Sequence, residues 1–194
     1  MSVERCTLGA MSIDVRPYRE LEPKEMDEWE RLVKKAHPPG EVRIGSDLRW
    51  ADLNPETDYL IRLWDEDELR ACAWVTQRTI RISGRETPVA GIRGVVTDPD
   101  QRRRGYGRAV MWRAHELMRS FADCEFAVLF SSVMAVPFYE DLGWRAIRGP
   151  VTCDQPGGSI DYTETLATAP VMVLGLRPSA DLPSGPVDVR GLPW

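Results

Sequence analysis

The sequence has few of the residues that build metal centres or disulfide scaffolds. It contains four cysteines and two histidines, and no two cysteines are spaced as CxxC. Structural zinc is therefore not expected, and we predict no metal cofactor. Cys72 and Cys124 lie inside apolar, strand-like runs, which is typical of buried free thiols. Reduced cysteines of this kind indicate a cytoplasmic location.

Long apolar runs and an excess of basic residues are also missing. No apolar run approaches the roughly 20 residues that a membrane-spanning helix needs, so no membrane partner is expected. The N-terminal residues lack the apolar core of a signal peptide. The formal net charge is −5, which argues against a nucleic-acid partner, because such proteins usually carry a basic surface. An acidic chain fits a cationic substrate.

The length and composition suit one compact domain. The chain has 194 residues, 43% of them hydrophobic, which is enough for a core. No linker rich in proline, glycine or serine divides the first 150 residues. We predict a flexible leader over residues 1–11, one domain over residues 12–178 and a tail rich in proline and glycine over residues 179–194.

Hydrophobic spacing along the domain changes between the period of strands and that of helices. The helix expected over residues 22–37 has Pro23 near its start and Pro38 after its end, both of which are boundary signals. A meander of strands comes next, and the Asp65–Glu68 run reads as a solvated hairpin tip. The expected strands are 12–18, 59–64, 69–81, 87–97, 125–130, 145–153 and 169–176, and the other expected helices are 48–53, 107–121 and 133–142.

The most informative stretch runs from Val95 to Gly107 and reads as a strand, a tight loop and the start of a helix. Gly105 and Gly107 lack a Cβ, so the backbone can turn sharply and approach a ligand. Amides of the loop and of the helix N-terminus point into one small space, where the helix dipole adds positive charge. Four arginines surround this space: Arg102, Arg103, Arg104 and Arg108. The pattern predicts a site for a pyrophosphate.

A basic turn before an ordinary surface helix would give a similar pattern, because glycine before a helix is common. Two observations favour the anion site. The acidic chain concentrates three successive arginines here, against its overall charge. The preceding strand is apolar and long enough to be central in a sheet.

The loop resembles the [Q/R]xxGx[G/A] signature of the GNAT superfamily of N-acetyltransferases, with the sequence Arg102-Arg103-Arg104-Gly105-Tyr106-Gly107. A second GNAT signature follows at the right distance, because residues 136–144, VPFYEDLGW, resemble the helical FYxxxGF segment. The pair in this order is much more specific than either motif alone. The order of elements also matches the superfamily from residue 12 to residue 176.

The resemblance implies an α+β, GNAT-like fold: a mixed, mostly antiparallel central sheet, splayed between its fourth and fifth strands and flanked by helices on both faces. Acetyl-CoA is the implied cosubstrate, lying in the splay. Backbone groups of Val95, Val96 and Thr97 would pair with its pantetheine arm. The acetyl group would pass directly from the thioester to an amine. The residues expected around the pyrophosphate are Arg102, Arg103, Arg104, Gly105, Tyr106, Gly107 and Arg108.

Two steps of this reaction need protein groups. Tyr139 matches the tyrosine that in many of these enzymes lies beside the thioester sulfur, where a phenol with a pKa of about 10 can protonate the departing thiolate. Packing within an aromatic run is the alternative. The attacking amine must also lose a proton, and Arg93 stands near the position of the usual glutamate. Arginine cannot act as a base, so Glu164, Asp161 or the terminal carboxylate of Trp194 are the candidates.

A finer resemblance is to the aminoglycoside 2'-N-acetyltransferase family, carried by residues 129–151, by the strand at 170–176 and by the closing Trp194. In that family the carboxylate of a C-terminal tryptophan helps to hold the polycationic sugar. The tail would then contact the acceptor site, or a partner subunit, and a frayed hydrophobic end is the alternative. Acids such as Asp47 and Asp161 would complete an anionic pocket.

Arg93 departs from that family, which places an acid there. Arg93 is therefore expected either to bind a substrate anion or to pair with a neighbouring acid. The predicted function is acetylation of a small amine, such as an aminoglycoside antibiotic, a related amino sugar or another small amine. The alternatives are a peptide or protein N-acetyltransferase and a non-catalytic acyl-CoA sensor, which the lack of an obvious base would favour. Relatives are often dimers, and a homodimer stays open.

Overall fold

The computed structural model describes residues 6–8, 11–37, 51–147, 149–155, 157–162, 170–178 and 185–194. The chain divides into two compact units. Unit 1 comprises Met1–Glu41, Leu53–Thr76 and Arg93–Leu117, and unit 2 comprises Val42–Asp52, Gln77–Ile92 and Met118–Trp194. Two long strands, β4 (Glu68–Ile82) and β5 (Arg85–Thr97), have residues in both units, as does the helix α2 (Tyr106–Ser120).

Unit 1 is built on an antiparallel set of strands. β2 (Met11–Pro17) pairs along its whole length with β3 (Tyr59–Asp65), and β3 pairs with the first half of β4. A short strand, β1 (Cys6–Leu8), pairs with the start of β2. This strand lies within the segment expected to be a flexible leader, and it forms because β2 offers it an antiparallel edge.

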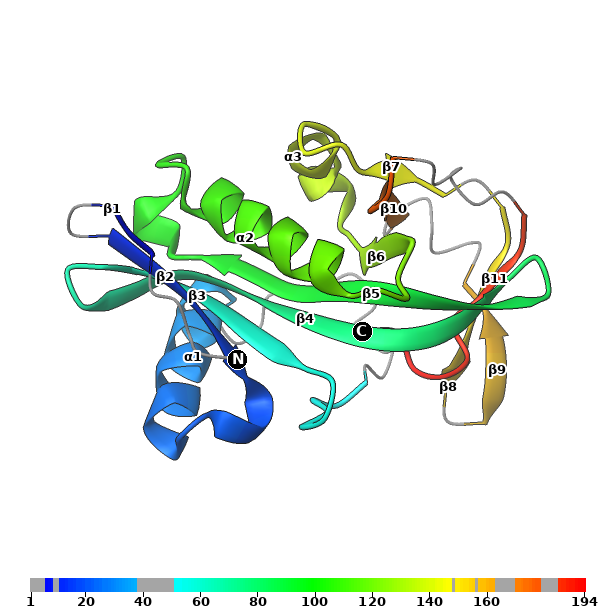
Figure 1. Ribbon diagram of the computed structural model, residues 1–194, viewed down its shortest axis with the longest axis horizontal. Coiled ribbons are helices and arrows are strands. Elements are labelled where there is room, and N and C mark those ends of the chain that lie inside the picture. Colours follow the sequence, from blue (N-terminus) through cyan, green and yellow to red (C-terminus); the bar gives the residue numbers. More distant parts are fainter. Residues whose placement is uncertain are drawn as a thin grey trace. The chain divides into compact units, whose positions relative to one another are not determined.

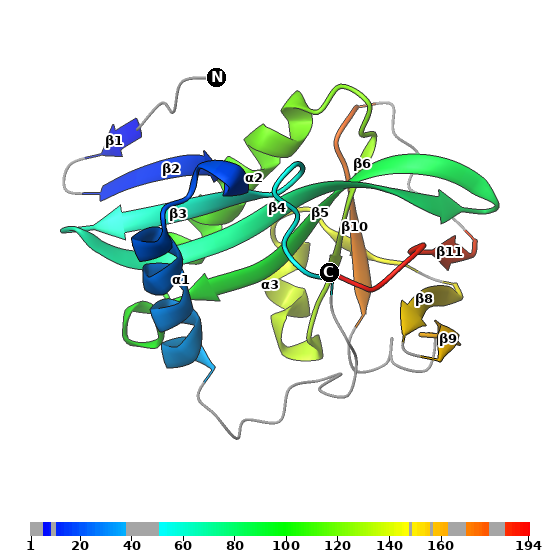
Figure 2. The ribbon, with the colours of Figure 1, turned by 90° about the horizontal axis from the view of Figure 1, so that it is seen from below.

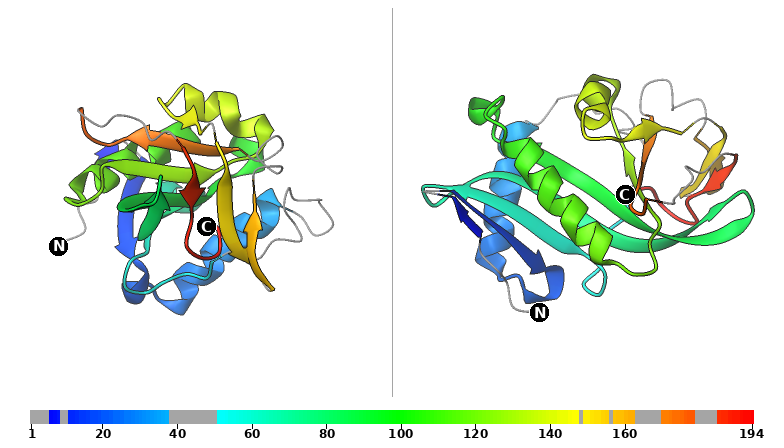
Figure 3. Two further views of the ribbon diagram at one scale, coloured as in Figure 1. Left: turned by 90° about the vertical axis from the view of Figure 1, so that its right-hand side faces the viewer. Right: turned by 45° about the horizontal axis from the view of Figure 1, so that its top comes forward.

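The two helices of unit 1 lie on opposite faces of its strands (Figures 1 and 3). α1 (Pro23–Ala36) begins as the sequence predicts, with a capping box between Glu22 and Glu25 and proline in the first turn. Its apolar side buries Leu32 and Ala36 against a core that includes Leu60 and Trp74. α2 crosses the other face. Short 3₁₀ turns, η1 (Tyr18–Glu20) and η2 (Pro99–Gln101), precede α1 and α2.

Unit 2 contains the parallel part of the sheet. β6 (Phe126–Phe130) pairs in parallel with β5 over Val89–Ile92 and antiparallel with β10 (Val171–Gly175). β7 (Arg145–Ala146) continues this edge beyond β10. The turn η3 (Val133–Ala135) and the short helix α3 (Val136–Glu140) follow β6. The expected mixed α+β fold is confirmed.

The sheet forks where β5 and β6 separate. Their pairing ends at Ile92 and Leu129, yet β5 continues to Thr97. Gly94 has a φ of +57° just past the last pair, a conformation that a residue with a Cβ adopts only under strain. This fork is the splay that the sequence predicted between the fourth and fifth strands, here β5 and β6.

The C-terminal third of the chain differs from the sequence prediction. The single strand expected over 145–153 is two, β7 and β8 (Val151–Gln155), because Gly149 has a φ of +147° and Pro150 follows it. β9 (Gly158–Asp161) pairs with β8 as a hairpin inside the expected polar loop. β11 (Val187–Asp188) pairs with both β4 and β8, so the tail is part of the sheet (Figure 2).

The helix expected over 48–53 is not helical at residues 51–53, and its other residues lie outside the described ones. Cys72, Cys124 and Cys153 are buried free thiols, as predicted for the first two. His115 is buried beside Trp112. No helix among the described residues is long and apolar enough to cross a membrane.

Candidate functional site

The loop between β5 and α2 has the geometry of an anion cradle. Arg103 has a φ of +64° and Gly105 a φ of +86°, so two of its residues adopt the left-handed conformation. Such alternation turns successive backbone amides toward one side. A Cβ at Gly105 would meet no atom within 4 Å. Within the protein, the glycine is therefore needed for its backbone angles, and its open side faces the proposed ligand site.

α2 starts directly after this loop. Its first backbone bond runs from the Ala109 amide to the Gly105 carbonyl, 2.9 Å apart, so the amides of Tyr106 and Gly107 have no acceptor within the helix. No acidic residue lies in the first turn. The predicted loop arginines are all exposed, namely Arg102, Arg103, Arg104 and Arg108. An exposed nest with fixed positive charge fits the pyrophosphate of acetyl-CoA.

Tyr106 fixes the end of the loop. Its ring is buried, and its hydroxyl donates to Asp65 Oδ2 at 2.6 Å. The sequence had placed Asp65 in a solvated hairpin tip. In the structure Glu66, Asp67 and Glu68 are exposed, and Glu66 and Asp67 have left-handed angles. Asp65 is half-buried and anchors α2 to β3.

Arg93 lies on β5 one residue past the fork and is neutralised within unit 1. Its Nη2 donates to Asp58 Oδ2 at 2.5 Å, and the Asp58 side chain is 1% exposed. The amide of Asn54 donates to the same Asp58 oxygen at 2.7 Å. Of the two expectations for Arg93, pairing with a neighbouring acid is the one the structure shows. Val96, further along β5, is buried, while Val95 and Thr97 are half-buried.

Tyr139 lies in unit 2 on α3 and is 8% exposed. Its ring packs edge-on against Phe138 and Trp144, with centroids 5.1 and 6.3 Å away. Burial raises the pKa of Tyr139 to about 12. The phenol is therefore protonated over the whole neutral range, which a proton donor requires, and its packing also satisfies the alternative interpretation.

Trp194 is a buried part of unit 2, so the alternative of a frayed end is wrong. The side chain is 4% exposed, the Arg78 guanidinium lies 5.0 Å from its ring centroid, and Phe130 packs edge-on at 5.7 Å. Arg78 Nη1 donates to the Leu192 carbonyl at 2.5 Å. A Cβ at Gly91 would collide with Trp194 Nε1, so the indole fills a slot on β5 that only glycine leaves open.

Of the remaining acids of the predicted acceptor site, the structure describes Asp161. Asp161 ends β9 and is exposed, while Glu164 and Asp47 lie outside the described residues. Phe130 contacts both Trp194 and Tyr162, which brings the tail and the end of β9 into one cluster. Residues 95–97 and 102–108, predicted to bind the coenzyme, all belong to unit 1.

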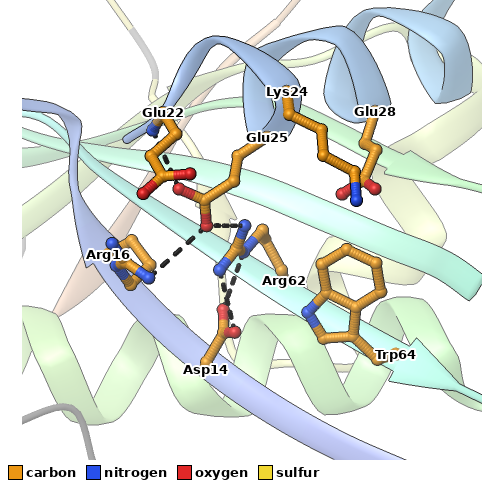
Figure 4. A pocket seen from close by; sticks show the side chains of 8 residues that line it. All are labelled: Asp14, Arg16, Glu22, Lys24, Glu25, Glu28, Arg62 and Trp64. Carbon is orange, nitrogen blue, oxygen red and sulfur yellow. Dashed lines mark hydrogen bonds and ion pairs between the residues drawn. The ribbon is translucent and has the colours of Figure 1, made fainter. Parts of the chain in front are cut away.

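Unit 1 also carries a polar hollow of about 430 Å³ on β2, β3 and α1 (Figure 4). At its centre Arg62 donates to both Asp14 oxygens, at 2.8 and 2.9 Å, and to Glu25 at 2.5 Å. Arg16 lies 3.4 Å from Glu25. Because the buried Asp14 and Arg62 and the half-buried Glu25 and Arg16 neutralise one another, we interpret the hollow as a structural ion-pair network.

Long-range partners escaped the sequence analysis. Asp58 is 35 residues from Arg93, and Asp65 is 41 residues from Tyr106. Neither pair has a local spacing that would reveal it. A single local signal was available for the fork: Gly94 inside an otherwise apolar strand, a position that often marks a bulge.

A mixed sheet in which the long strand β5 leads through an anion cradle into a helix fits the arrangement expected of the GNAT acetyltransferases. The model of the acetyltransferase (GNAT) domain matches residues 17–147, so the chain belongs to this family. The superfamily prediction is thereby confirmed.

Solved structures share this fold at low sequence identity. ElaA of Escherichia coli is 15% identical and has a TM-score of 0.60, over 84% of this chain and 98% of that one. A putative N-acetyltransferase of Lactobacillus plantarum is 17% identical, with a TM-score of 0.59 over 87% and 100%. A GNAT acetyltransferase of Brucella melitensis in complex with acetyl-CoA is 16% identical, with a TM-score of 0.56 over 90% and 94%.

A curated relative matches over a shorter stretch. Glucosamine 6-phosphate N-acetyltransferase of Trypanosoma brucei brucei is 43% identical over 58 residues. That match spans 30% of this chain and 39% of the relative.

Proposed function

We propose that this chain is an acetyl-CoA-dependent N-acetyltransferase whose acceptor is a small amine of the amino-sugar class. The observation that carries the proposal is the loop at 102–108, where left-handed Arg103 and Gly105 lead into the amides of α2 among exposed arginines. The local likeness to a glucosamine 6-phosphate N-acetyltransferase supports the amino-sugar class. An aminoglycoside is a finer candidate, supported by the resemblance of residues 129–151 to the aminoglycoside 2'-N-acetyltransferase family.

Acetyl-CoA would bring the activated acetyl group as a thioester. The loop amides and arginines hold its pyrophosphate, and Val95–Thr97, which lie beyond the last residue of β5 paired with β6, offer backbone groups to its pantetheine arm. The acceptor nitrogen then bonds to the acetyl carbon as the carbon–sulfur bond breaks. One proton leaves the nitrogen and one reaches the sulfur, so the step balances without a covalent enzyme intermediate.

Tyr139 is the proposed donor to the departing sulfur. The pKa of Tyr139 is about 12, whereas that of a thiol is about 8.5. Complete proton transfer from the phenol to the thiolate is therefore unfavourable by roughly 3 to 4 pKa units. We therefore assign Tyr139 a hydrogen bond that stabilises developing charge on sulfur, with full protonation following the bond cleavage. Asp161, Glu164 and the Trp194 carboxylate remain the candidate bases.

One observation favours a second function, that of an acyl-CoA sensor. Arg93 stands near the usual position of the base and is engaged with Asp58, so β5 supplies no carboxylate there. A sensor would bind the coenzyme and leave its thioester intact.

Release of free thiol from acetyl-CoA tests these functions. The panel of acceptors contains glucosamine 6-phosphate, an aminoglycoside, a simple alkylamine and a peptide with a free N-terminus. Turnover with an amino sugar above the peptide is the expected result. Tight binding of CoA by calorimetry, with no thiol release on any amine, would establish the sensor, and preference for the peptide would establish a protein acetyltransferase.

A further inference from the structure

The start of the coenzyme loop is fixed by a buried carboxylate. Asp98, the residue that follows β5, has a side chain only 5% exposed. Its Oδ1 accepts the amide of Asp100 at 3.1 Å and so caps η2, while Oδ2 lies 3.3 Å from Arg70 Nη1. The Asp98 amide in turn donates to the Arg70 carbonyl at 2.7 Å. Both the backbone and the side chain of Asp98 are therefore held.

Lys35 reaches this carboxylate from the last turn of α1. Its Nζ lies 2.6 Å from Asp98 Oδ1 and 2.8 Å from Asp100 Oδ2. The Lys35 ammonium thus bridges Asp98, which precedes η2, and Asp100, which lies in η2. Arg70 completes the network from β4 and pairs with Glu68 at 2.6 Å. All five side chains belong to unit 1, as does the loop they border.

Asp98 is a buried carboxylate close to the proposed pyrophosphate site, where a negative charge is unfavourable unless cations neutralise it. Burial alone raises the pKa of Asp98, but the bonds from Lys35, from the Asp100 amide and from Arg70 outweigh it, and the pKa lies below its usual value. Asp98 is therefore charged, and without its two cations it would repel a pyrophosphate held a few residues further on. The same cations stop the turn from sampling other conformations, so less ordering entropy remains to be lost when a ligand binds.

We propose that Asp98 is a positioning residue. Held in place by Lys35 of α1, it fixes the conformation of the coenzyme loop and thereby sets the affinity for acetyl-CoA. This inference rests on the proposed function. It assigns Asp98 and Lys35 no contact with substrate. They act through the shape of the Asp98–Tyr106 turn, whose other end is held by the bond from Tyr106 to Asp65.

Three variants test the pairing: Lys35→Met, Asp98→Asn and the double substitution. Asparagine at position 98 keeps an oxygen for the Asp100 amide and removes the charge. Each single substitution should raise the Kd for CoA and the KM for acetyl-CoA by about tenfold, the worth of one charged hydrogen bond. The kcat at saturating acetyl-CoA should be unchanged. The double variant should be no weaker than the weaker single one, because both changes remove one contact.

The chain offers a matched control at the neighbouring position. Lys34 lies on the same helical turn and its Nζ pairs with Glu30 at 2.8 Å, an exposed contact. Lys34→Met should leave both constants at their wild-type values, and Lys35→Arg should restore the affinity that Lys35→Met loses. Because Lys35 is 43% exposed, Lys35→Met should fold even where Asp98→Asn does not, and its melting temperature should fall somewhat below that of Lys34→Met, because the buried Asp98 loses a cation.

The outcomes separate this inference from the proposed function. If the wild-type chain binds no CoA in the calorimeter, the proposed function fails, and this inference with it. If the wild type binds CoA and Lys35→Met binds it as well as Lys34→Met does, the positioning role alone is overturned. A loss of kcat without a change in KM would also overturn it.

Discussion

Gly105 is the residue on which the coenzyme site depends most directly. Its φ of +86° is left-handed and its side-chain direction is open. Gly105→Asp should therefore cost roughly 1 kcal/mol of folding stability from backbone strain. It should also abolish CoA binding, because the new carboxylate would stand where the pyrophosphate is expected. Calorimetry with CoA measures the second effect, and urea unfolding measures the first.

Gly84 provides the matched control for this substitution. It has a φ of +82°, and a Cβ there would also meet nothing within 4 Å, but it lies in the β4–β5 turn. Gly84→Asp should show the same small loss of stability with wild-type affinity for CoA. Equal affinities for CoA in the two variants would contradict the placement of the site.

Tyr139 carries the second prediction at this scale. Tyr139→Phe should lower kcat by about tenfold to a hundredfold, since it removes the proposed donor to sulfur, and should leave the Kd for CoA unchanged. Because the pKa of Tyr139 is about 12, the hydroxyl stays protonated up to pH 10, so no loss of rate below that pH should trace to it. Initial rates measured from pH 6 to pH 10 test both statements.

Tyr162 is a suitable control, because its ring is also fully buried and its pKa is also raised to about 12. Its hydroxyl has no hydrogen-bond partner among the described residues, so Tyr162→Phe should cost no stability. Turnover in this variant should equal that of the wild type. Wild-type turnover in Tyr139→Phe would remove Tyr139 from the reaction.

At the scale of elements, the sequence predicted what local signals encode. The bounds of α1 and α2 were predicted to within about one residue, because Pro23 and Pro38 flank α1 and Gly105 precedes α2. The two-residue strand β11 and the β8–β9 hairpin were missed. Such short strands have too few residues to show an alternating pattern, and they form because β4 and β8 offer them partners.

The residues of the candidate site also divide into those that a local sequence pattern predicts and those that it does not. The anion cradle is contiguous in the chain, so its glycines and arginines were visible as a motif. The partner of Arg93 was not, because Asp58 approaches it only through the pairing of the strands between them. Lys35 was equally invisible, since a lysine in the last turn of a helix is favoured there by the helix dipole alone.

The ion-pair network that ties α1 to β2 and β3 should make the folding stability depend on pH in the acidic range. Burial raises the pKa of Glu25. The Glu22 amide, Arg62 and Arg16 lower it by more than burial raises it, so the net pKa lies below the usual 4.5. The stability that Glu25 contributes is therefore complete above pH 4.5 and is lost as the pH falls through the lowered value. Glu25→Gln should cost about 2 kcal/mol at pH 7, and this difference should shrink on acidification.

Urea unfolding of the wild type and Glu25→Gln at pH 7, 5, 4 and 3 measures the difference. Glu30→Gln is the control, because Glu30 makes an exposed pair with Lys34 that is worth about 1 kcal/mol or less. A gap between wild type and Glu25→Gln that widened as the pH fell would contradict the assigned direction of the pKa shift.

On the scale of the whole molecule, the C-terminal tail has a structural role in unit 2. Residues 187–194 bury Val187, Val189 and Trp194 in the core of unit 2. They also make backbone bonds within that unit, since the Asp154 amide donates to the Gly191 carbonyl at 2.8 Å and the Ala51 amide to the Pro193 carbonyl at 2.7 Å. Unit 2 therefore depends on its tail for part of its core.

Deletion of residues 187–194 should destabilise unit 2 by at least about 3 kcal/mol, the cost of removing one large buried side chain. Hydrogen exchange reports where the loss falls. The Asp154 and Ala51 amides should exchange faster, because their acceptors are gone. In unit 1, the Tyr18 amide, bonded to the Asp58 carbonyl at 2.9 Å, should keep its protection. Equal acceleration at all three amides, or none at Asp154, would show that the tail does not stabilise unit 2 in this way.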